Sequence, residues 1–272
     1  PLAMFAGAIG YFLLANVTIL EPAKPFVNWL IAVLTPFLIF AQLLLTFCKI
    51  EPKELLPKAW HVWLLSIQAV SSGIIALLLI FCPMEEAYRD IFEGAMVCLI
   101  CPTATAAAVI TGKLGGSAST LTTYTLLSNV LAAIAVPLVF PLVEPHADIT
   151  FVVAFLKILS KVFPLLLAPF FIALLFRYYI PSVHRLLSKY HGVAFYLWAV
   201  ALTIVTGQTV RSLVTAAADV SIEIMIALAG LATCCLQFYF GKRIGSAYHD
   251  RISAGQALGQ KNTVLAIWMA VT

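Results

Sequence analysis

The amino-acid sequence predicts an all-α polytopic membrane protein. Of its 272 residues, 62% are hydrophobic and only 10% are charged, and the mean hydropathy is +1.03. Soluble domains carry about 25% charged residues. The apolar residues form long continuous runs, unlike the roughly ten-residue alternating strands of a membrane β-barrel. Because the bilayer core offers no water to backbone groups, such runs must form helices.

Nine apolar segments follow one another along the chain, each close to the roughly 20 residues that a spanning helix needs. They cover residues 2–20, 26–48, 60–82, 92–112, 118–142, 150–176, 192–209, 221–240 and 252–272. Five of them fall within residues 1–143, so the second half, residues 144–272, enters the membrane inverted. Both chain ends lie inside apolar runs, which is typical of the ordered part of a longer protein. We therefore expect two inverted five-helix repeats, with a tenth helix missing after Thr272.

The loop charges predict the orientation. With the N-terminal end inside, ten loop cations face the cytoplasm and three face outside, which is a clear positive-inside bias. The cytoplasmic ones are Lys49, Lys53, Lys58, Lys113, Arg177, Arg185, Lys189, Lys242, Arg243 and Arg251, and the outer ones are Lys24, Arg89 and Arg211. We expect an integral protein of a bacterial inner (plasma) membrane. The net charge of +4 comes without a basic run, so we expect no nucleic-acid partner.

Two of the nine segments contain helix breakers at matching positions in the two halves. Pro102 interrupts the fourth segment and is flanked by Thr103 and Thr105. A proline removes a helical hydrogen bond and clashes with the preceding turn. The ninth segment is interrupted between Gly255 and Thr263, with a second glycine at Gly259. Each break alone is compatible with an ordinary kink, but paired breaks are typical of inverted-repeat transporters with crossed discontinuous helices around a binding site.

Lys261 lies in the middle of the ninth segment. A charge near the bilayer centre costs at least about 2.5–3.5 kcal/mol and usually has a function. Lys261 follows Arg251 by ten residues, about 15 Å of helix, so its side chain cannot easily reach the cytoplasmic interface. We interpret Lys261 as a fixed internal cation or a proton carrier, and the sequence does not decide between these roles.

Other polar residues of the apolar segments complete the predicted substrate or ion site. Gln256 and Gln260 share one helix face, and Gln68 is an isolated amide in the third segment. The alternative interpretation is that these amides only join helices, and that hydroxyls such as that of Thr125 only bond their own helix. The full set of candidate site residues is Lys261, Gln256, Gln260, Asn262, Thr263, Gln68, Thr103, Thr105 and Thr125, with Pro102, Gly255 and Gly259 as helix-breaking residues.

Several function classes do not fit this sequence. All Asp residues fall in loops, which argues against an intramembrane aspartyl protease, and every His lies in or beside a loop, which argues against a Ser/His protease and against a His-based metal site. The six cysteines lie in or next to apolar segments without a second Cys pair of the zinc type. A channel would need a charged ring or filter-like repeat. We expect no enzyme activity, no metal site and no cofactor, while a transporter-like sensor or receptor stays open.

The two interruptions and Gln68 together resemble the bile acid:sodium symporter family. The stretch from Cys101 to Val109 is similar to the family's C-P-G-G-T-A-S-N-V break, and the stretch from Gln256 to Asn262 is similar to its E-V-G-M-Q-N-S break. The resemblance implies ten helices in two inverted repeats. A panel domain would contain helices 1, 2, 6 and 7, and a core domain helices 3, 4, 5, 8 and 9. It also implies transport of organic anions together with two sodium ions.

This chain departs from the family pattern at most implied sodium ligands. Ala107, Ala108 and Leu121 stand where the family has polar ligands, Gln256 replaces the bridging Glu, and Lys261 replaces an Asn, whereas Gln68, Gln260 and Thr125 are retained. We therefore expect degenerate sodium sites and a secondary transporter of small organic anions by alternating access that is sodium-independent or proton-coupled. A sodium-coupled symporter with altered ion sites is the alternative. The sequence leaves the substrate unidentified and leaves open whether the protein is a homodimer.

Overall fold

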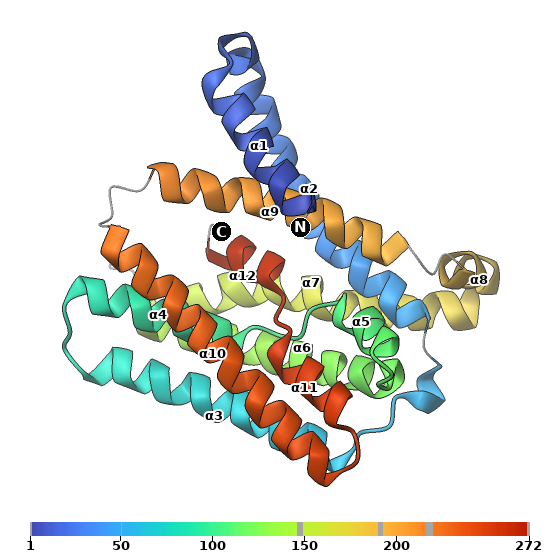
Figure 1. Cartoon of the computed structure of the whole chain (residues 1–272). Coiled ribbons are helices and arrows are strands. Elements are labelled where there is room, and N and C mark those ends of the chain that lie inside the picture. Colours follow the sequence, from blue (N-terminus) through green and yellow to red (C-terminus); the bar gives the residue numbers. More distant parts are fainter. Residues whose placement is uncertain (1, 50, 146–148, 190–192, 216–219, 271–272) are drawn as a thin grey trace.

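The computed structural model describes residues 2–49, 51–145, 149–189, 193–215 and 220–270, and within them every regular element is a helix. Figure 1 shows their arrangement. The first half contains α1 (Leu2–Asn16), η1 (Thr18–Ala23), α2 (Lys24–Cys48), η2 (Pro52–Glu54), α3 (Ala59–Phe81), α4 (Glu86–Ile100), α5 (Ala107–Lys113) and α6 (Ala118–Val143). The second half contains α7 (Phe151–Tyr179), α8 (Pro181–Lys189), α9 (Val193–Thr215), α10 (Val220–Ala247), α11 (Arg251–Gly259) and α12 (Thr263–Ala270).

The helix lengths support an integral membrane protein. Among the described residues, six helices are long and apolar enough to cross a membrane, namely α2 with the end of η1, α3, α6, α7, α9 and α10. The predicted first segment is the shorter apolar helix α1. Large apolar side chains such as Trp29, Phe37 and Phe171 are exposed on the helices, as expected for surfaces that contact lipid.

The remaining two predicted segments are each split into two short helices. Residues 101–106, which we call the first break, separate α4 from α5 and contain Pro102. Residues 260–262, which we call the second break, separate α11 from α12. The two breaks lie near the centre of the molecule in Figure 1, where the α11–α12 connection passes over the α4–α5 connection.

One predicted helix-breaking residue is placed differently. Gly255 lies inside α11 rather than in the second break, and α11 continues to Gly259. A Cβ atom added to Gly255 would come within 2.7 Å of the Lys242 side chain on α10. The prediction that Gly255 breaks the helix is therefore wrong. Its lack of a side chain serves the packing of two helices.

α10 and α11 form a tightly packed antiparallel pair. Gly241 and Gly245 of α10 are buried one turn apart. A Cβ atom added to Gly241 would lie 2.6 Å from the carbonyl oxygen of Ala254, and one added to Gly245 would lie 2.5 Å from the Cβ atom of the same alanine. Small residues four apart allow membrane helices to approach this closely. The pair fixes α11, and with it the second break.

Among the described residues there are three apolar clusters, and the two largest of them hold together the helices around the breaks. The larger includes Leu43, Ile100, Val136, Leu166 and Leu265 and joins α2, α4, α6, α7, α9 and α12. The smaller joins α3, α5, α6 and α11 around Trp60, Tyr124 and Leu258. Both breaks are therefore connected to packed helices on either side.

Arg89 connects the ends of three helices at the predicted outer side of the protein. The Arg89 guanidinium of α4 pairs with Glu93 and Glu144, each at 2.9 Å. It also donates hydrogen bonds to the carbonyl oxygens of Leu79 and Val143. The ends of α3 and α6 are thereby joined to the start of α4.

A second polar cluster lies at the predicted cytoplasmic end. The Asp250 carboxylate, before α11, accepts hydrogen bonds from the Lys58 ammonium at 3.0 Å and from the Thr120 hydroxyl at 3.4 Å. Burial raises the pKa of Asp250, but hydrogen bonds from Ser253, Lys58 and Thr120 outweigh this effect, so its pKa lies below the usual value. The ionised carboxylate thus joins the starts of α3 and α6 to α11.

We expect Asp250→Asn to lower the free energy of unfolding by about 1–2 kcal/mol at neutral pH, because the bonds to a charged acceptor are weakened. Since the folded-state pKa is depressed, this stabilisation is fully present above about pH 4 and is lost as the pH falls through the folded-state pKa. Thermal unfolding of the purified protein as a function of pH measures the effect. The exposed Asp90→Asn variant is the control, and a wild-type advantage over Asp250→Asn that does not shrink in acid would contradict the assignment.

Candidate functional site

The two breaks pair with each other through their backbones. The amide of Ala104 donates to the carbonyl oxygen of Gln260 at 2.8 Å, and the amide of Asn262 donates to the carbonyl oxygen of Pro102 at 2.9 Å. These two bonds form a short antiparallel bridge between Thr103 and Lys261. Because proline cannot continue the helix at this point, backbone groups released from α4 find partners in the second break. The bridge brings Lys261 to the first break.

Three long polar side chains occupy the C-terminal end of α4, where the last carbonyl groups have no partner within the helix. Two are amides from α3 and α10, and the third is the ammonium of Lys261. The Nε2 atom of Gln68 donates to Ile100 at 3.0 Å and to Cys101 at 3.2 Å, that of Gln237 donates to Cys98 at 3.3 Å, and Nζ of Lys261 donates to Leu99 at 3.4 Å.

Lys261 therefore has a defined electrostatic partner. The C-terminal end of a helix carries about half a negative charge from its aligned peptide dipoles, and the ammonium group lies against it. The residue is partly buried. An ammonium group has three N–H donors, and the described hydrogen bond to Leu99 uses one of them. The remaining donors can serve an anion.

The two predicted threonines of the first break contact different helices. The Thr103 hydroxyl donates to the carbonyl oxygen of Ala257 in α11 at 2.7 Å, and its amide donates to the Ser128 hydroxyl of α6 at 3.2 Å. The Thr105 hydroxyl donates to Oε1 of Gln42 in α2 at 2.8 Å. Both threonines are buried. The first break is thus joined to α2, α6 and α11 by side-chain hydrogen bonds.

Two amide side chains, Gln256 of α11 and Gln260 of the second break, have oxygen atoms that accept no described hydrogen bond. Among the described residues, no group donates to Oε1 of Gln256 or to Oε1 of Gln260, and both oxygens are buried. A buried acceptor without a partner costs about 1–3 kcal/mol, so each needs an explanation. A bound cation or a donor group on a substrate would satisfy them.

The structure gives local roles to the other predicted residues. Asn262 caps α12, because its Oδ1 atom accepts the amide of Leu265 at 3.1 Å. Thr263 is the first residue of α12. The Thr125 hydroxyl donates to the carbonyl oxygen of Leu121, one turn earlier on α6. The structure therefore brings Lys261, Gln68, Gln260, Asn262, Thr103 and Thr105 to the first break and the end of α4. Thr125 is linked to Thr103 through the Ser128 hydroxyl, which also donates to the Thr125 carbonyl oxygen at 3.1 Å.

Sequence reasoning missed two buried glutamines around the breaks, Gln42 and Gln237. Gln42 and Gln237 contact the first break and the end of α4, each from a long apolar helix. The polar residues of the fifth predicted segment lie on α6, where Tyr124 donates to Oε1 of Gln68 at 3.2 Å and the buried Asn129 side chain has no described partner. The signal that could have found the two glutamines is the one that identified Gln68, an isolated amide within an apolar segment.

We expect Gln68→Leu to destabilise the protein by about 2–3 kcal/mol, because two carbonyl groups of α4 and the Tyr124 hydroxyl would lose their partners. Thermal unfolding in detergent measures the loss. Gln208→Leu on α9 is the matched control, since the described residues include no hydrogen-bond partner for Gln208. Equal stability of the two variants would show that Gln68 does not hold the end of α4.

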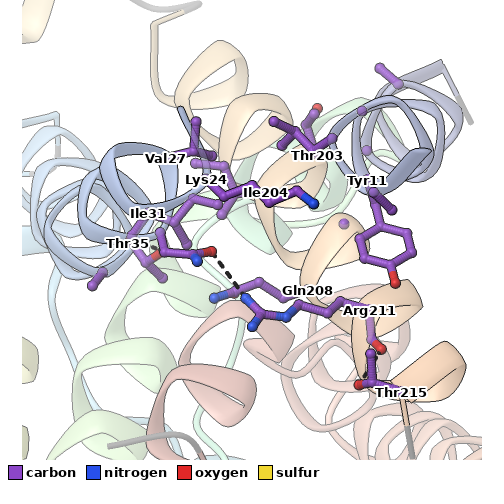
Figure 2. Close-up of a pocket in the computed structure, with 18 of the residues that line it drawn as sticks. Tyr11, Lys24, Val27, Ile31, Thr35, Thr203, Ile204, Gln208, Arg211 and Thr215 are labelled. Carbon is purple, nitrogen blue, oxygen red and sulfur yellow. Dashed lines mark hydrogen bonds between the residues drawn. The ribbon is translucent and has the colours of Figure 1, made fainter. Parts of the chain in front are cut away.

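A cavity of about 590 Å³ lies between α1, α2 and α9. Trp268 of α12, a little beyond the second break, also lines it. Figure 2 shows Arg211 and Gln208 of α9 extending between Tyr11 and the side chains of α2. The Arg211 guanidinium donates to Oδ1 of Asn28 at 3.0 Å, and Lys24 of α2 also lines the cavity. None of the residues predicted for the site lines this cavity.

Comparison with known proteins identifies the family. The model of the Sodium Bile acid symporter family matches residues 13–216, which is three quarters of the chain, so this chain belongs to that family. The match includes the first break and ends before the second break and Lys261. No curated protein matches the chain. The resemblance noted in the sequence is confirmed, and the chain is a membrane transporter of a non-enzymatic family.

Proposed function

We propose that this member of the family is a secondary transporter of small organic anions that works by alternating access, with Lys261 as its internal cation. The observation that carries the proposal is the ammonium group of Lys261 at the C-terminal end of α4, beside the bridge between the two breaks. Because this fixed positive charge already balances the partial negative charge at the end of α4, no dissolved cation is needed there. Transport would then be independent of sodium or coupled to protons.

The organic-anion specificity rests on the same charge. A carboxylate bonded to an ammonium group forms a charge-assisted hydrogen bond, roughly twice as strong as a neutral one. In a site shielded from water the attraction is stronger than at a surface. The donors of Lys261 that Leu99 does not use are therefore the groups we assign to the substrate anion.

We also propose an inverted-repeat architecture with a panel of α1, α2, α7 and α9. The core contains α3, α6 and α10 together with the two broken helices, α4 with α5 and α11 with α12. In this arrangement α7 corresponds to α1, and α4 with α5 corresponds to α11 with α12. α6 packs along α7, whereas α1 has only Gly7 buried. A tenth helix that covers α1 as α6 covers α7 would complete the symmetry and narrow the cavity of Figure 2.

The proposed location is a bacterial plasma membrane with the N-terminal end in the cytoplasm. The proposal rests on the excess of Lys and Arg in the loops that would then be cytoplasmic. In this orientation the Lys58–Asp250 pair lies at the cytoplasmic side and the Arg89 cluster at the outer side. The proposal places the substrate site between these two clusters.

Sodium coupling is the second candidate, and one observation favours it. The Oε1 atoms of Gln256 and Gln260 are buried without a donor, and neutral carbonyl oxygens of this kind suit a monovalent cation. Burying such an ion without a nearby carboxylate is costly. The ammonium of Lys261 nearby adds repulsion, which is why we favour sodium independence.

The test is a binding screen followed by a flux measurement. Organic acids are screened for thermal stabilisation of the full chain, and the best of them is then followed as radiolabelled solute in liposomes that contain the protein. The proposal predicts saturable uptake with and without sodium in the medium. Stabilisation without any flux would identify a sensor or receptor instead, and uptake that requires sodium would favour the second candidate.

A further inference from the structure

The cavity between α1, α2 and α9 is an elongated slot with a closed deep end. Along α2 its lining runs from Lys24 to Thr35, a distance of about 16 Å at 1.5 Å per residue. At the deep end α1 and α9 touch, because a Cβ atom added to Gly7 would clash with the backbone of Thr203 and lie 3.1 Å from the amide nitrogen of Gly207. A molecule in the slot therefore cannot continue between these two helices.

Apolar side chains form much of the wall of the slot. Leu14 of α1, Val27 and Ile31 of α2, Ile204 of α9 and Trp268 of α12 all line it. The volume of about 590 Å³ falls within the roughly 300–1,000 Å³ that is usual for small-molecule sites. A long, narrow apolar wall of this kind suits a single hydrocarbon chain.

Two cations line the slot at its other end. The Arg211 guanidinium donates to the neutral amide of Asn28 at 3.0 Å, which uses one of its five N–H donors and leaves its charge in place. Lys24 pairs with Glu21 at 3.4 Å, and both side chains of this pair are solvent-exposed, so the pair itself is weak. Figure 2 shows Lys24 and Arg211 extending into the space from α2 and α9, with Tyr11 on α1 opposite them. Two cations and one carboxylate leave this end attractive to an anion.

We infer that the slot binds a single-chain amphipathic monocarboxylate, such as a medium-chain fatty acid, at a site separate from that around Lys261. The carboxylate accepts charge-assisted hydrogen bonds from Arg211 and Lys24, and the chain lies along the apolar wall toward Trp268. Because the deep end is closed between α1 and α9, the ligand enters and leaves at the cationic end and is held rather than transported. The inference depends neither on the proposed transport nor on the proposed orientation.

Fluorescence quenching of the full chain in phosphatidylcholine nanodiscs tests this inference without any transport substrate. The probe is dodecanoate brominated at its last carbon, because bromine quenches tryptophan only at short range and would lie near Trp268. Wild-type protein is expected to show a saturable quenching component that unbrominated dodecanoate displaces and that Trp268→Phe removes. Arg211→Gln is expected to bind the probe about tenfold more weakly, because it loses a charge-assisted hydrogen bond to the carboxylate.

Two pairs of variants separate the slot from the rest of the surface. Gly10 lines the cavity, and a Cβ atom added there meets nothing within 4 Å. Gly10→Leu is therefore expected to fold normally, to occupy part of the slot and to abolish the saturable component. Gly73→Leu on α3 is its matched control, since a Cβ atom there also meets nothing within 4 Å and Gly73 does not line the cavity. Arg243→Gln, which removes an exposed cation of α10, is the control for Arg211→Gln.

Several results would overturn the inference. Quenching that never saturates, or that persists unchanged in Arg211→Gln or in Gly10→Leu, would show that the slot does not hold the probe. Equal displacement by dodecanol would show that the carboxylate is not recognised, and equal displacement by acetate would show that the chain is not. Displacement by phosphatidylglycerol added to the discs would identify a phospholipid as the occupant instead. Size-exclusion chromatography verifies that each variant is folded. A failed flux experiment leaves this binding measurement unaffected, so the two proposals fail separately.

Discussion

Replacing Gly241 with valine is expected to prevent the chain from reaching its native fold. A Cβ atom at this position would lie 2.6 Å from a backbone oxygen of Ala254 and 3.0 Å from the Cα atom of Gly255. Both are backbone atoms of α11, so no side-chain rotation relieves the clash. Overpacking typically costs about 1–3 kcal/mol where side chains can move, and we expect more than about 3 kcal/mol here. That is a large part of the roughly 5–15 kcal/mol that stabilises a folded protein.

Fluorescence-detected size-exclusion chromatography and thermal unfolding measure this effect. The same substitution at Gly73 of α3 is the control, since a Cβ atom there meets nothing within 4 Å. Gly73→Val is expected to run as a single folded species with nearly unchanged stability. A folded Gly241→Val variant with the wild-type melting temperature would show that α10 and α11 are not packed as the structure describes.

Replacing Lys261 with methionine is expected to abolish transport while the protein stays folded. Methionine matches the length of the aliphatic part of lysine but offers no charge to the substrate anion or to the end of α4. The loss of a charge-assisted bond of about 2–3 kcal/mol corresponds to a drop in uptake of roughly 30- to 150-fold. Uptake of the best-stabilising organic acid into liposomes measures it.

The control for this variant is Lys157→Met on α7. Lys157 is an exposed lysine of an apolar helix with no described hydrogen bond to either break. Its replacement is expected to leave uptake within about twofold of the wild type, because surface substitutions usually have small effects. Undiminished uptake by Lys261→Met would show that transport does not need the charge of Lys261.

The sequence predicted the helices well where composition alone decides. Long apolar runs such as 60–82 and 118–142 correspond to α3 and α6 within one or two residues. Pro102 fell in the first break because proline is incompatible with a helix interior irrespective of packing. Gly255 was misassigned because a glycine can either interrupt a helix or allow a neighbouring helix to approach closely. Only the position of Gly241 and Gly245 on the neighbouring helix shows which applies.

The polar contacts of the site were less predictable. Lys261 was identified because a charge in an apolar segment is rare. Its partner Leu99 contributes only a backbone carbonyl group, and a backbone partner cannot be recognised from the type of residue that provides it. Gln237 and Gln42 were overlooked because their partners lie 139 and 63 positions away in sequence. Such pairs form where α2 and α10 pack against the first break and the end of α4, and their register depends on the packing of whole helices.

Sodium dependence of uptake in wild-type protein and in Lys261→Asn tests the central claim most directly. If Lys261 acts in place of a dissolved cation, wild-type uptake is the same in sodium-free medium, and Lys261→Asn either transports poorly or becomes sodium-dependent. Wild-type uptake that disappears when sodium is removed, or an asparagine variant that transports normally and ignores sodium, would contradict the account.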